Sequence, residues 1–325
     1  MKTDQILRIG TRRLAMALAV TTACTGLWAE NAAKEQCSVA IVSRLVGTGT
    51  KVCDGAVVQQ MAQRGHVFEQ NQLGLASILA IGPDYSTKNA LDWFQKAAQR
   101  GYAPAQVNLA VMYTNGWGVP PNYGVAQHWL REAAKQNFPR AYYDLGILYF
   151  EGRGVKQDNE EAFRWFQKGA DAGDSNAQTN LGYFYDQGLA GQRNMAEAVK
   201  WYRTAAEAGN PLAENNLGDL YLRGDGVGQD NATAFDWFQK AAVQGQTGAR
   251  IKLAAMYANG RGTAKNIETA YAWGWAAATA GDSRGKELLH SLEQQLKPEQ
   301  IARATARARD LNAGERELSA RNFVQ

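Results

Sequence analysis

The chain contains few of the residues that carry most catalytic and metal chemistry. It has 325 residues, of which three are histidine and three are cysteine. The histidines are His66, His128 and His290, and no two of them have the spacing of a metal-ligand pair such as His-x-x-x-His. Glycine-rich turns such as "EGRGV" lack the Gly-x-x-x-x-Gly-Lys-Ser/Thr spacing of a phosphate-binding loop. We therefore expect no enzyme activity, no metal and no cofactor.

The chain also lacks an excess of one charge. It has 35 Lys and Arg and 31 Asp and Glu, but four of the basic residues and one acidic residue lie in the first 29 positions. The remainder carries 31 positive and 30 negative side chains, which gives no reason to expect a nucleic acid or an acidic membrane surface as a partner. The apolar run 14–28 is too short, and too rich in Thr and Ala, to indicate a permanent spanning helix.

The N-terminus does contain the pattern of an export signal, at 1–29. Basic residues precede the apolar run "LAMALAV", and small residues follow before Ala29, after which cleavage is expected. The stretch "TRRLAMA" resembles a twin-arginine signal, and "TTAC" resembles a lipoprotein signal that would attach a lipid anchor at Cys24, although Thr21 stands where Leu is usual. The pattern predicts a periplasmic or secreted protein and leaves the export route and the lipidation of Cys24 open.

Export would leave two cysteines in an oxidising compartment. Removal of the signal takes away Cys24, and Cys37 and Cys53 remain. The segment between them indicates a helix, a Gly-Thr turn and the start of a second helix, so a disulfide would join a capping hairpin at 30–66. Closing a loop of this size stabilises a fold by roughly 3 kcal/mol on the chain-entropy model. Two unpaired buried thiols are the alternative.

Tryptophan recurs every 36 residues through most of the chain. Alanines recur three positions before and five positions after each of these tryptophans, which places all three rows on one face of a helix. A large ring flanked by small methyl groups suits close packing between helices. We therefore expect the tryptophan row to form the core between hairpins, so that Trp201→Ala costs about 3–5 kcal/mol. The row comprises Trp93, Trp129, Trp165, Trp201, Trp237 and Trp273.

Another helix precedes each tryptophan helix, so every repeat has a first and a second helix. The first helix is marked by Ala, Leu and Tyr at spacings of four, as in Ala141, Leu145 and Tyr149. A Gly or Ala follows each leucine, and because glycine inside a helix costs up to about 1 kcal/mol, its return indicates a tight helix crossing. Gly or Asn ends both helices. The expected N-caps of the second helices are Ser86, Asn122, Asp158, Asn194, Asp230 and Asn266.

The repeated pattern is A-x-x-x-L-G-x-x-Y-x-x-G-x-G-V, followed by D-x-x-x-A-x-x-W-x-x-K-A-A-x-x-G, and the segment 141–174 matches it almost position for position. This pattern resembles Sel1-like repeats, which are relatives of the tetratricopeptide repeat. The resemblance implies an all-α, right-handed superhelical solenoid of helical hairpins in an exported bacterial protein. We expect six repeats of 36 residues at 67–282, capping helices at 283–313 and a loose tail at 314–325.

In the related tetratricopeptide fold, side chains on the inner face of each first helix bind peptides, and the resemblance implies a similar concave groove here. Asn amides can bond an extended backbone, while Tyr and Phe supply anchors. Lys252 interrupts the row of Asn and Asp residues. The alternative is that these side chains bridge neighbouring first helices or face water. The predicted groove residues are Asn108, Arg140, Tyr143, Asp144, Ile147, Phe150, Asn176, Asn180, Tyr183, Asp186, Asn215, Asn216, Asp219 and Leu222.

These features predict a non-catalytic scaffold of the bacterial envelope that binds a protein or peptide. One alternative is a cell-wall glycan or peptide ligand, for which Trp117 and Trp275, outside the periodic row, are the stacking candidates. A further alternative comes from secreted, cysteine-rich Sel1 proteins that have been linked to β-lactam binding or hydrolysis. The chain has a formal Ser-x-x-Lys at Ser283 to Lys286, but it has no Lys-Thr-Gly and lacks the repeated cysteine pairs of that group.

Overall fold

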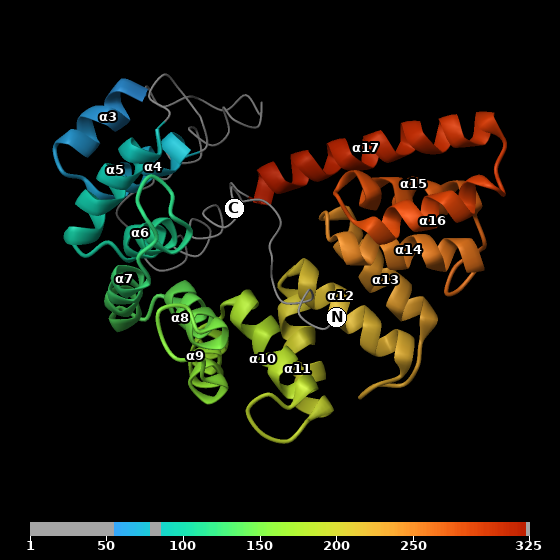
Figure 1. Cartoon of the computed structure of the whole chain (residues 1–325), viewed down its shortest axis with the longest axis horizontal. Helices are drawn as coiled ribbons and strands as arrows, with labels where there is room; N and C mark the ends of the chain where they lie inside the picture. Colours follow the sequence, from blue (N-terminus) through green and yellow to red (C-terminus); the bar gives the residue numbers. More distant parts are fainter. Residues whose placement is uncertain (1–54, 79–85, 323–325) are drawn as a thin grey trace. The chain divides into compact units, whose positions relative to one another are not determined.

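The computed structural model describes residues 55–78 and 86–322, and every regular element within these two ranges is an α-helix (Figure 1). The export signal predicted at 1–29, Cys24, and the predicted cysteine pair Cys37 and Cys53 lie outside the described residues. Helix α3 (Gly55–Gln63) precedes the repeats. The first helices of the six hairpins are α4 (Val67–Ile78), α6 (Ala103–Asn115), α8 (Pro139–Glu151), α10 (Ser175–Gln187), α12 (Pro211–Arg223) and α14 (Thr247–Asn259).

The second helices complete the hairpins, and two more helices follow them. The second helices are α5 (Thr87–Gln99), α7 (Tyr123–Lys135), α9 (Asn159–Asp171), α11 (Met195–Glu207), α13 (Asn231–Val243) and α15 (Ile267–Thr279). After them come α16 (Ser283–Glu293) and α17 (Pro298–Asn322).

The helices fall into two compact units, each of which is described by itself. The first contains α3 to α9, and the second, Ser175–Ser319, contains α10 to α16 and most of α17. In both units a first helix packs against the second helix of its own hairpin, which in turn packs against the first helix of the next. Such nearest-neighbour stacking is the architecture of a repeat solenoid. The predicted all-α solenoid of helical hairpins is confirmed.

Local sequence determines where these helices begin and end. All six predicted N-cap side chains accept hydrogen bonds from backbone amides of the first turn, as Asp158 does from Glu161 N at 3.0 Å. Gly116, Gly152, Gly224 and Gly260 end first helices in the left-handed conformation, with φ between 66° and 73°. Asn137, which takes the place of glycine after α7, has a φ of 57°. Gly and Asn are the residues that adopt this conformation most easily.

The ring row that fills the hairpin core is not the tryptophan row. Five of the six periodic tryptophans are half-buried, and Trp273 is buried. The residue that follows each of the first five tryptophans is instead nearly inaccessible to solvent. Consecutive side chains on a helix are rotated by about 100° around its axis, and this rotation turns the following residue toward the first helix. The expectation that Trp201 is a central core ring is therefore wrong, and Tyr202 holds that place. The buried row comprises Phe94 at 0% exposure, Leu130 at 2%, Phe166 at 0%, Tyr202 at 1% and Phe238 at 0%.

Each buried ring lies against the glycine that follows the leucine of its first helix. A Cβ atom placed on Gly146 would lie 2.5 Å from Cε1 of Phe166, far closer than carbon atoms approach. The expected tight crossing is confirmed, and the residue sizes are matched across it. Glycine faces an aromatic ring in four hairpins, in the pairs Gly74–Phe94, Gly146–Phe166, Gly182–Tyr202 and Gly218–Phe238. In the other two hairpins the same two sequence positions hold alanine and a smaller residue, as Ala110 with Leu130 and Ala254 with Gly274.

This matching predicts the outcome of a methyl insertion. Gly146→Ala is expected to lower the free energy of unfolding by about 1–3 kcal/mol, because overpacking against the fully buried ring outweighs the better helix propensity of alanine. Adding Phe166→Leu to Gly146→Ala recreates the Ala110–Leu130 pair and is expected to cost less than the two single changes added together. Urea denaturation of both single variants and the double variant measures the coupling. Additive costs would contradict the matching.

The chain closes with two helices that follow the last hairpin (Figure 1). Helix α17 is tied to α15 through Glu268, which accepts hydrogen bonds from Arg303 and from Gln300, each at 2.8 Å. Helix α17 continues to Asn322, so most of the segment 314–325, predicted as a loose tail, is helical. Its sequence is rich in Ala, Arg, Glu and Leu, which are strong helix formers, and one glycine does not stop it.

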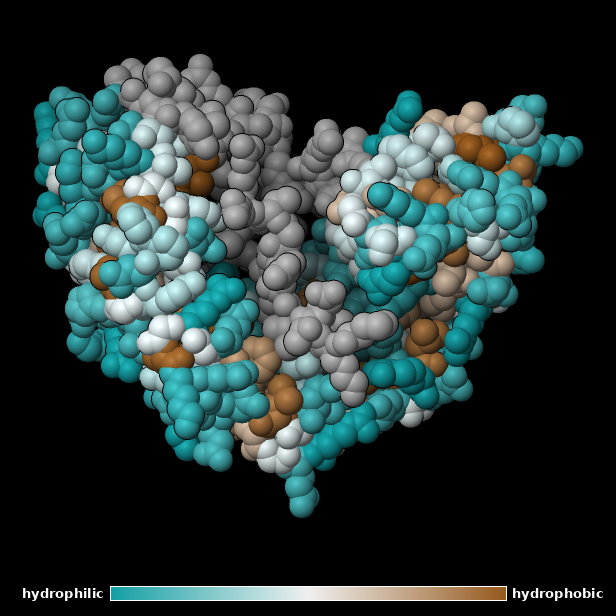
Figure 2. Space-filling model, viewed as in Figure 1, coloured by the Kyte–Doolittle hydropathy of each residue, from teal (hydrophilic) through white to brown (hydrophobic). Residues whose placement is uncertain are grey.

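The exposed surface is mostly polar. Figure 2 shows hydrophilic residues over most of the viewed face, with hydrophobic residues in small separate patches. None of the helices in the described ranges is both long enough and apolar enough to cross a bilayer.

Candidate functional site

The predicted groove residues lie on one side of the first helices. This side, called here the first-helix face, carries positions two, three and six after the alanine of each first helix, such as Tyr143, Asp144 and Ile147 in α8. Side chains at these spacings share one face of a helix. The first unit holds the predicted residues from Asn108 to Phe150, and the second holds those from Asn176 to Leu222. The two groups are treated separately below.

In the first unit, the face contains a buried ion pair instead of an open polar wall. Arg140 is 4% exposed, and its Nε donates to both carboxylate oxygens of Asp144 at 3.2 Å. Its guanidinium also lies over the ring of Tyr143, 4.7 Å from the centroid. Burial raises the pKa of Asp144, although the charge of Arg140 opposes the rise. Nη1 of Arg140 is buried without a partner among the described residues, but the ion pair and the ring contact hold the guanidinium in place, so their geometry indicates a structural cluster.

The neighbouring helix α6 shows how the amide row is used. Asn108 is fully buried, and its Nδ2 donates to Oδ1 of Asn71 on α4 at 2.9 Å. This bond joins two consecutive first helices, as the bridging alternative anticipates. Oδ1 of Asn108 is buried and has no partner within the part of the chain that the structure describes. Phe150, at the far end of α8, is half-buried.

In the second unit, the row begins with one bridge and one unsatisfied amide. Oδ1 of Asn176 accepts a hydrogen bond at 3.0 Å from Asn210, the residue that caps α12. Asn180 is 6% exposed, and among the described residues its Nδ2 finds no acceptor. A buried amide group left in this state costs about 1–3 kcal/mol.

The polar row continues to α14 through Lys252, which sequence reasoning treated as an interruption. Its Nζ donates to Oδ1 of Asn215 at 2.9 Å and forms an ion pair with Asp219. Asn215 is 4% exposed and donates from Nδ2 to Asn216 at 3.1 Å. Burial lowers the pKa of Lys252 while Asp219 opposes that change. A lysine 36 positions after Asn216, where the row calls for Asn or Asp, looks like a break in the sequence, and its bridging role is visible only in three dimensions.

The remaining predicted residues of this unit stay partly accessible. Tyr183 is half-buried, and burial raises the pKa of its hydroxyl, with the charge of Asp186 adding to the rise. Asp186 accepts from Arg193 at 3.2 Å, and the same guanidinium reaches Asp225. Because Asp186 and Asp219 each have a cationic partner, the first-helix face of this unit has no strong net charge.

The structure therefore separates the predicted residues into two groups. Five are buried, so they do not line an open groove: Asn108, Arg140, Tyr143, Asn180 and Asn215. The others are half-buried and can be reached from outside: Asp144, Ile147, Phe150, Asn176, Tyr183, Asp186, Asn216, Asp219 and Leu222.

The repeated geometry has a counterpart among known proteins. Six consecutive segments match the profile of the Sel1 repeat, at 70–102, 103–138, 139–174, 175–210, 211–246 and 248–282. They run through most of the chain without a break of more than one residue. This chain belongs to the Sel1 repeat family. Sel1 repeat proteins generally mediate protein–protein interactions, and the scaffold is typically non-catalytic.

Solved structures of Sel1 repeat proteins resemble this one. A Sel1 repeat protein from Oxalobacter formigenes is 32% identical, with a TM-score of 0.60 over 66% of this chain and 86% of that one. The protein c5321, described as a protective antigen of uropathogenic Escherichia coli with an SLR fold, is 25% identical, with a TM-score of 0.48 over 86% of this chain and 69% of its own. A comparison with curated proteins finds no match.

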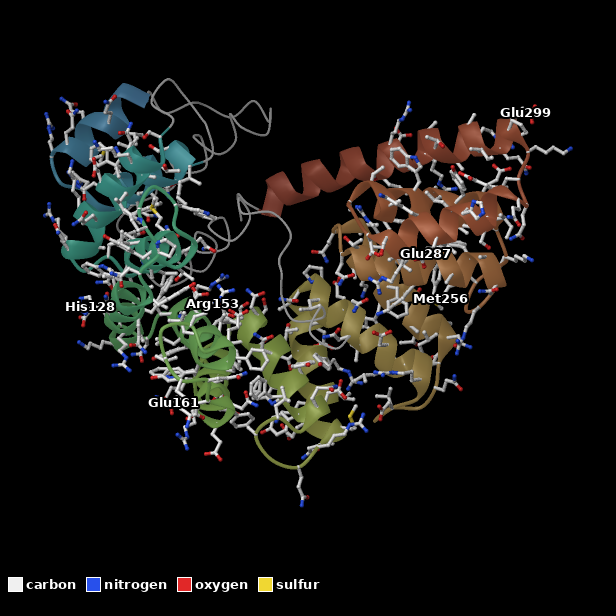
Figure 3. All side chains as sticks on the ribbon, viewed as in Figure 1. His128, Arg153, Glu161, Met256, Glu287 and Glu299 are labelled. Carbon is white, nitrogen blue, oxygen red and sulfur yellow. The ribbon has the colours of Figure 1, made fainter. Side chains whose placement is uncertain are left out.

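The residues on which the alternative functions would depend either pack against the core of this Sel1 protein or lie exposed on its helices. Trp117 and Trp275 are half-buried and pack against core clusters. Ser283 and Lys286 are exposed in the first turn of α16, where nothing shelters an acylation reaction from water. His128, labelled in Figure 3, is exposed on α7 with its ring 5.1 Å from that of Trp129. None of these placements favours a second function.

Proposed function

We propose that this Sel1 protein is a non-catalytic scaffold of the bacterial envelope that binds a protein or peptide segment along the first-helix face of its second unit. The family-level role in protein–protein interaction supports binding. The envelope location rests on the export pattern at 1–29 and on the cysteine pair Cys37 and Cys53, which suits an oxidising compartment.

One observation carries the choice of surface. Half-buried side chains lie at accessible positions on the consecutive first helices α10 and α12, beside the buried amide of Asn180. Tyr183 is an aromatic anchor with a polar tip, Asn216 an amide and Leu222 an apolar contact. An extended segment would supply carbonyl groups to the amides and side chains to the spaces between them. Because the acidic residues of this face are already paired, we expect recognition by shape and hydrogen bonding instead of charge.

Capture from an envelope fraction of the source bacterium tests this proposal. The double variant Tyr183→Ala/Leu222→Ala removes two accessible contacts while leaving the buried side chains of Asn180 and Asn215 unchanged. We expect it to retain less than about a tenth of the partner bound by the wild-type chain, since hot-spot side chains are each worth about 2 kcal/mol or more. The readout is quantitative mass spectrometry of the captured proteins.

A matched variant provides the control. Asp236→Ala/Gln239→Ala changes two exposed residues of α13, a second helix, and is expected to bind as the wild-type chain does. All variants must first show a wild-type thermal melt. Equal capture by the wild-type chain and the Tyr183/Leu222 variant would contradict the proposed surface. Binding to isolated peptidoglycan in place of a protein would contradict the partner class.

A further inference from the structure

One position of the first helices joins each helix to the end of the preceding one. It lies one residue after the alanine of the first helix, or after Glu69 in α4, and in four hairpins its side chain donates a hydrogen bond to the carbonyl eight residues earlier. That carbonyl is in the last turn of the preceding helix, where the usual bond from the amide four residues on is replaced by one from the residue three positions on, as from Gly209 to Ala206 at 2.9 Å. The bonds are Gln70 to Ala62 at 2.9 Å, Gln106 to Ala98 at 3.2 Å, Tyr142 to Ala134 at 3.1 Å and Arg250 to Ala242 at 3.1 Å.

Glu214 occupies this donor position at the start of α12. Its side chain is 3% exposed, and the corresponding acceptor is the carbonyl of Ala206 at the end of α11. An ionised carboxylate can only accept hydrogen bonds, and its charge is unfavourable beside the negative end of a helix dipole. The neutral acid, in contrast, has one hydroxyl to donate, as the side chains at the equivalent positions do.

The surroundings of Glu214 favour the neutral form near neutral pH. Burial raises the pKa of its carboxyl to about 7, against the opposing charge of Lys240 on α13 and the hydrogen bond from Gln244. Nε2 of Gln244 donates to Oε2 at 2.8 Å, which leaves Oε1 to carry the proton. Within the described residues, α11 brings no charged group that acts on this carboxyl. On α14, Arg250 donates to the Ala242 carbonyl and Lys252 pairs with Asp219.

We propose that Glu214 is a proton-dependent clamp between α11 and α12, in which the neutral acid donates to the carbonyl of Ala206 and the carboxylate breaks that bond. The junction between these two hairpins is tight in mildly acidic solution and loosens as the carboxyl ionises. This inference does not depend on the binding function, because it concerns the joint between two helices and not the first-helix face.

The sign of the pH dependence follows from proton linkage. The folded protein holds the proton of Glu214 up to about pH 7, whereas the unfolded chain releases it near the ordinary value of 4.5. The folded state therefore binds the proton more tightly, and the stability it contributes is complete below the ordinary value. That contribution is lost as the pH rises from there through about 7.

The variant Glu214→Gln tests the clamp, since Gln stands at the same position in three other repeats and donates at any pH. Between about pH 5 and about pH 8, we expect the unfolding equilibrium constant of the wild-type chain to rise more than about tenfold relative to Glu214→Gln. Glu207→Gln, at an exposed residue of α11, is the matched control and is expected to track the wild-type chain. Urea denaturation across this pH range gives the constants.

A carboxyl titration decides the protonation state directly. With glutamate labelled at the carboxyl carbon, the wild-type NMR spectrum should contain one signal that titrates near neutral pH, and this signal should be missing from Glu214→Gln. The wild-type titration needs no variant and remains decisive if Glu214→Gln does not fold. The proposal is overturned if every glutamate titrates below about pH 5.5, or if the unfolding constants of the wild-type chain and Glu214→Gln change in parallel.

Discussion

Replacing Phe166 by Ala is expected to lower the free energy of unfolding by about 3–5 kcal/mol. The ring is fully buried, lies against Gly146 and is 6.1 Å from the ring of Tyr143, so its removal leaves a cavity between α8 and α9. The adjacent Trp165 is larger, but it is half-buried, stacked on Tyr142 at 6.0 Å and covered by Lys168. Trp165→Ala should therefore cost only about 1–2 kcal/mol.

Urea denaturation followed by circular dichroism compares these two variants under the same conditions. The comparison is informative because the two residues are neighbours in one helix and both are aromatic. A cost for Trp165→Ala equal to or above that for Phe166→Ala would contradict the assignment of the core ring row. The same order is expected for Trp237 and Phe238 in the second unit, where Phe238 is fully buried.

Removing the charge of Asp144 is the second large effect that we expect. Asp144→Asn leaves the guanidinium of Arg140, which is 4% exposed, without its hydrogen-bonded counter-ion. Breaking a buried ion pair from one side costs about 3–5 kcal/mol, and we expect the lower end, because Asp144 keeps 15% exposure and Asp174 remains as a weaker charge partner of Arg140.

The control replaces both members of the pair. Arg140→Met/Asp144→Leu removes the two charges together and is expected to be close to neutral, since apolar residues of similar volume often replace a buried ion pair without loss. Glu197→Gln, in an exposed pair with Lys200, should change the free energy of unfolding by less than about 0.5 kcal/mol. If Asp144→Asn were as mild as Glu197→Gln, the cluster would not be structural.

Much of this fold could be predicted from local chemistry alone. The six N-cap side chains and the left-handed helix ends follow from residue types that act within a few positions of themselves. Trp recurs without exception, but recurrence alone does not distinguish a buried ring from a half-buried one, so it predicts the wrong core row. A better signal was present in the sequence. The residue after Trp is apolar in each of the first five repeats, and its size is matched by the Gly or Ala twenty positions earlier.

The candidate site was less predictable because its bonds join residues about one repeat apart. Asn108 with Asn71, and Lys252 with Asn215, are each separated by 37 positions. An Asn side chain can bridge two helices, cap a helix or contact a ligand, so the recurrence of Asn does not indicate which of these roles it has. Only the three-dimensional structure shows that Asn215 is buried in a bridge whereas Asn216, the next residue, stays accessible.

The central claim is that a protein or peptide segment binds the first-helix face of the second unit, and site-specific photo-crosslinking in the source bacterium tests it most directly. A photoreactive amino acid replaces either Leu222, on the first-helix face, or Gln239, exposed on a second helix. The account predicts a discrete protein adduct from position 222 and none from position 239. Adducts from position 239 alone, or no adduct from either position, would contradict it.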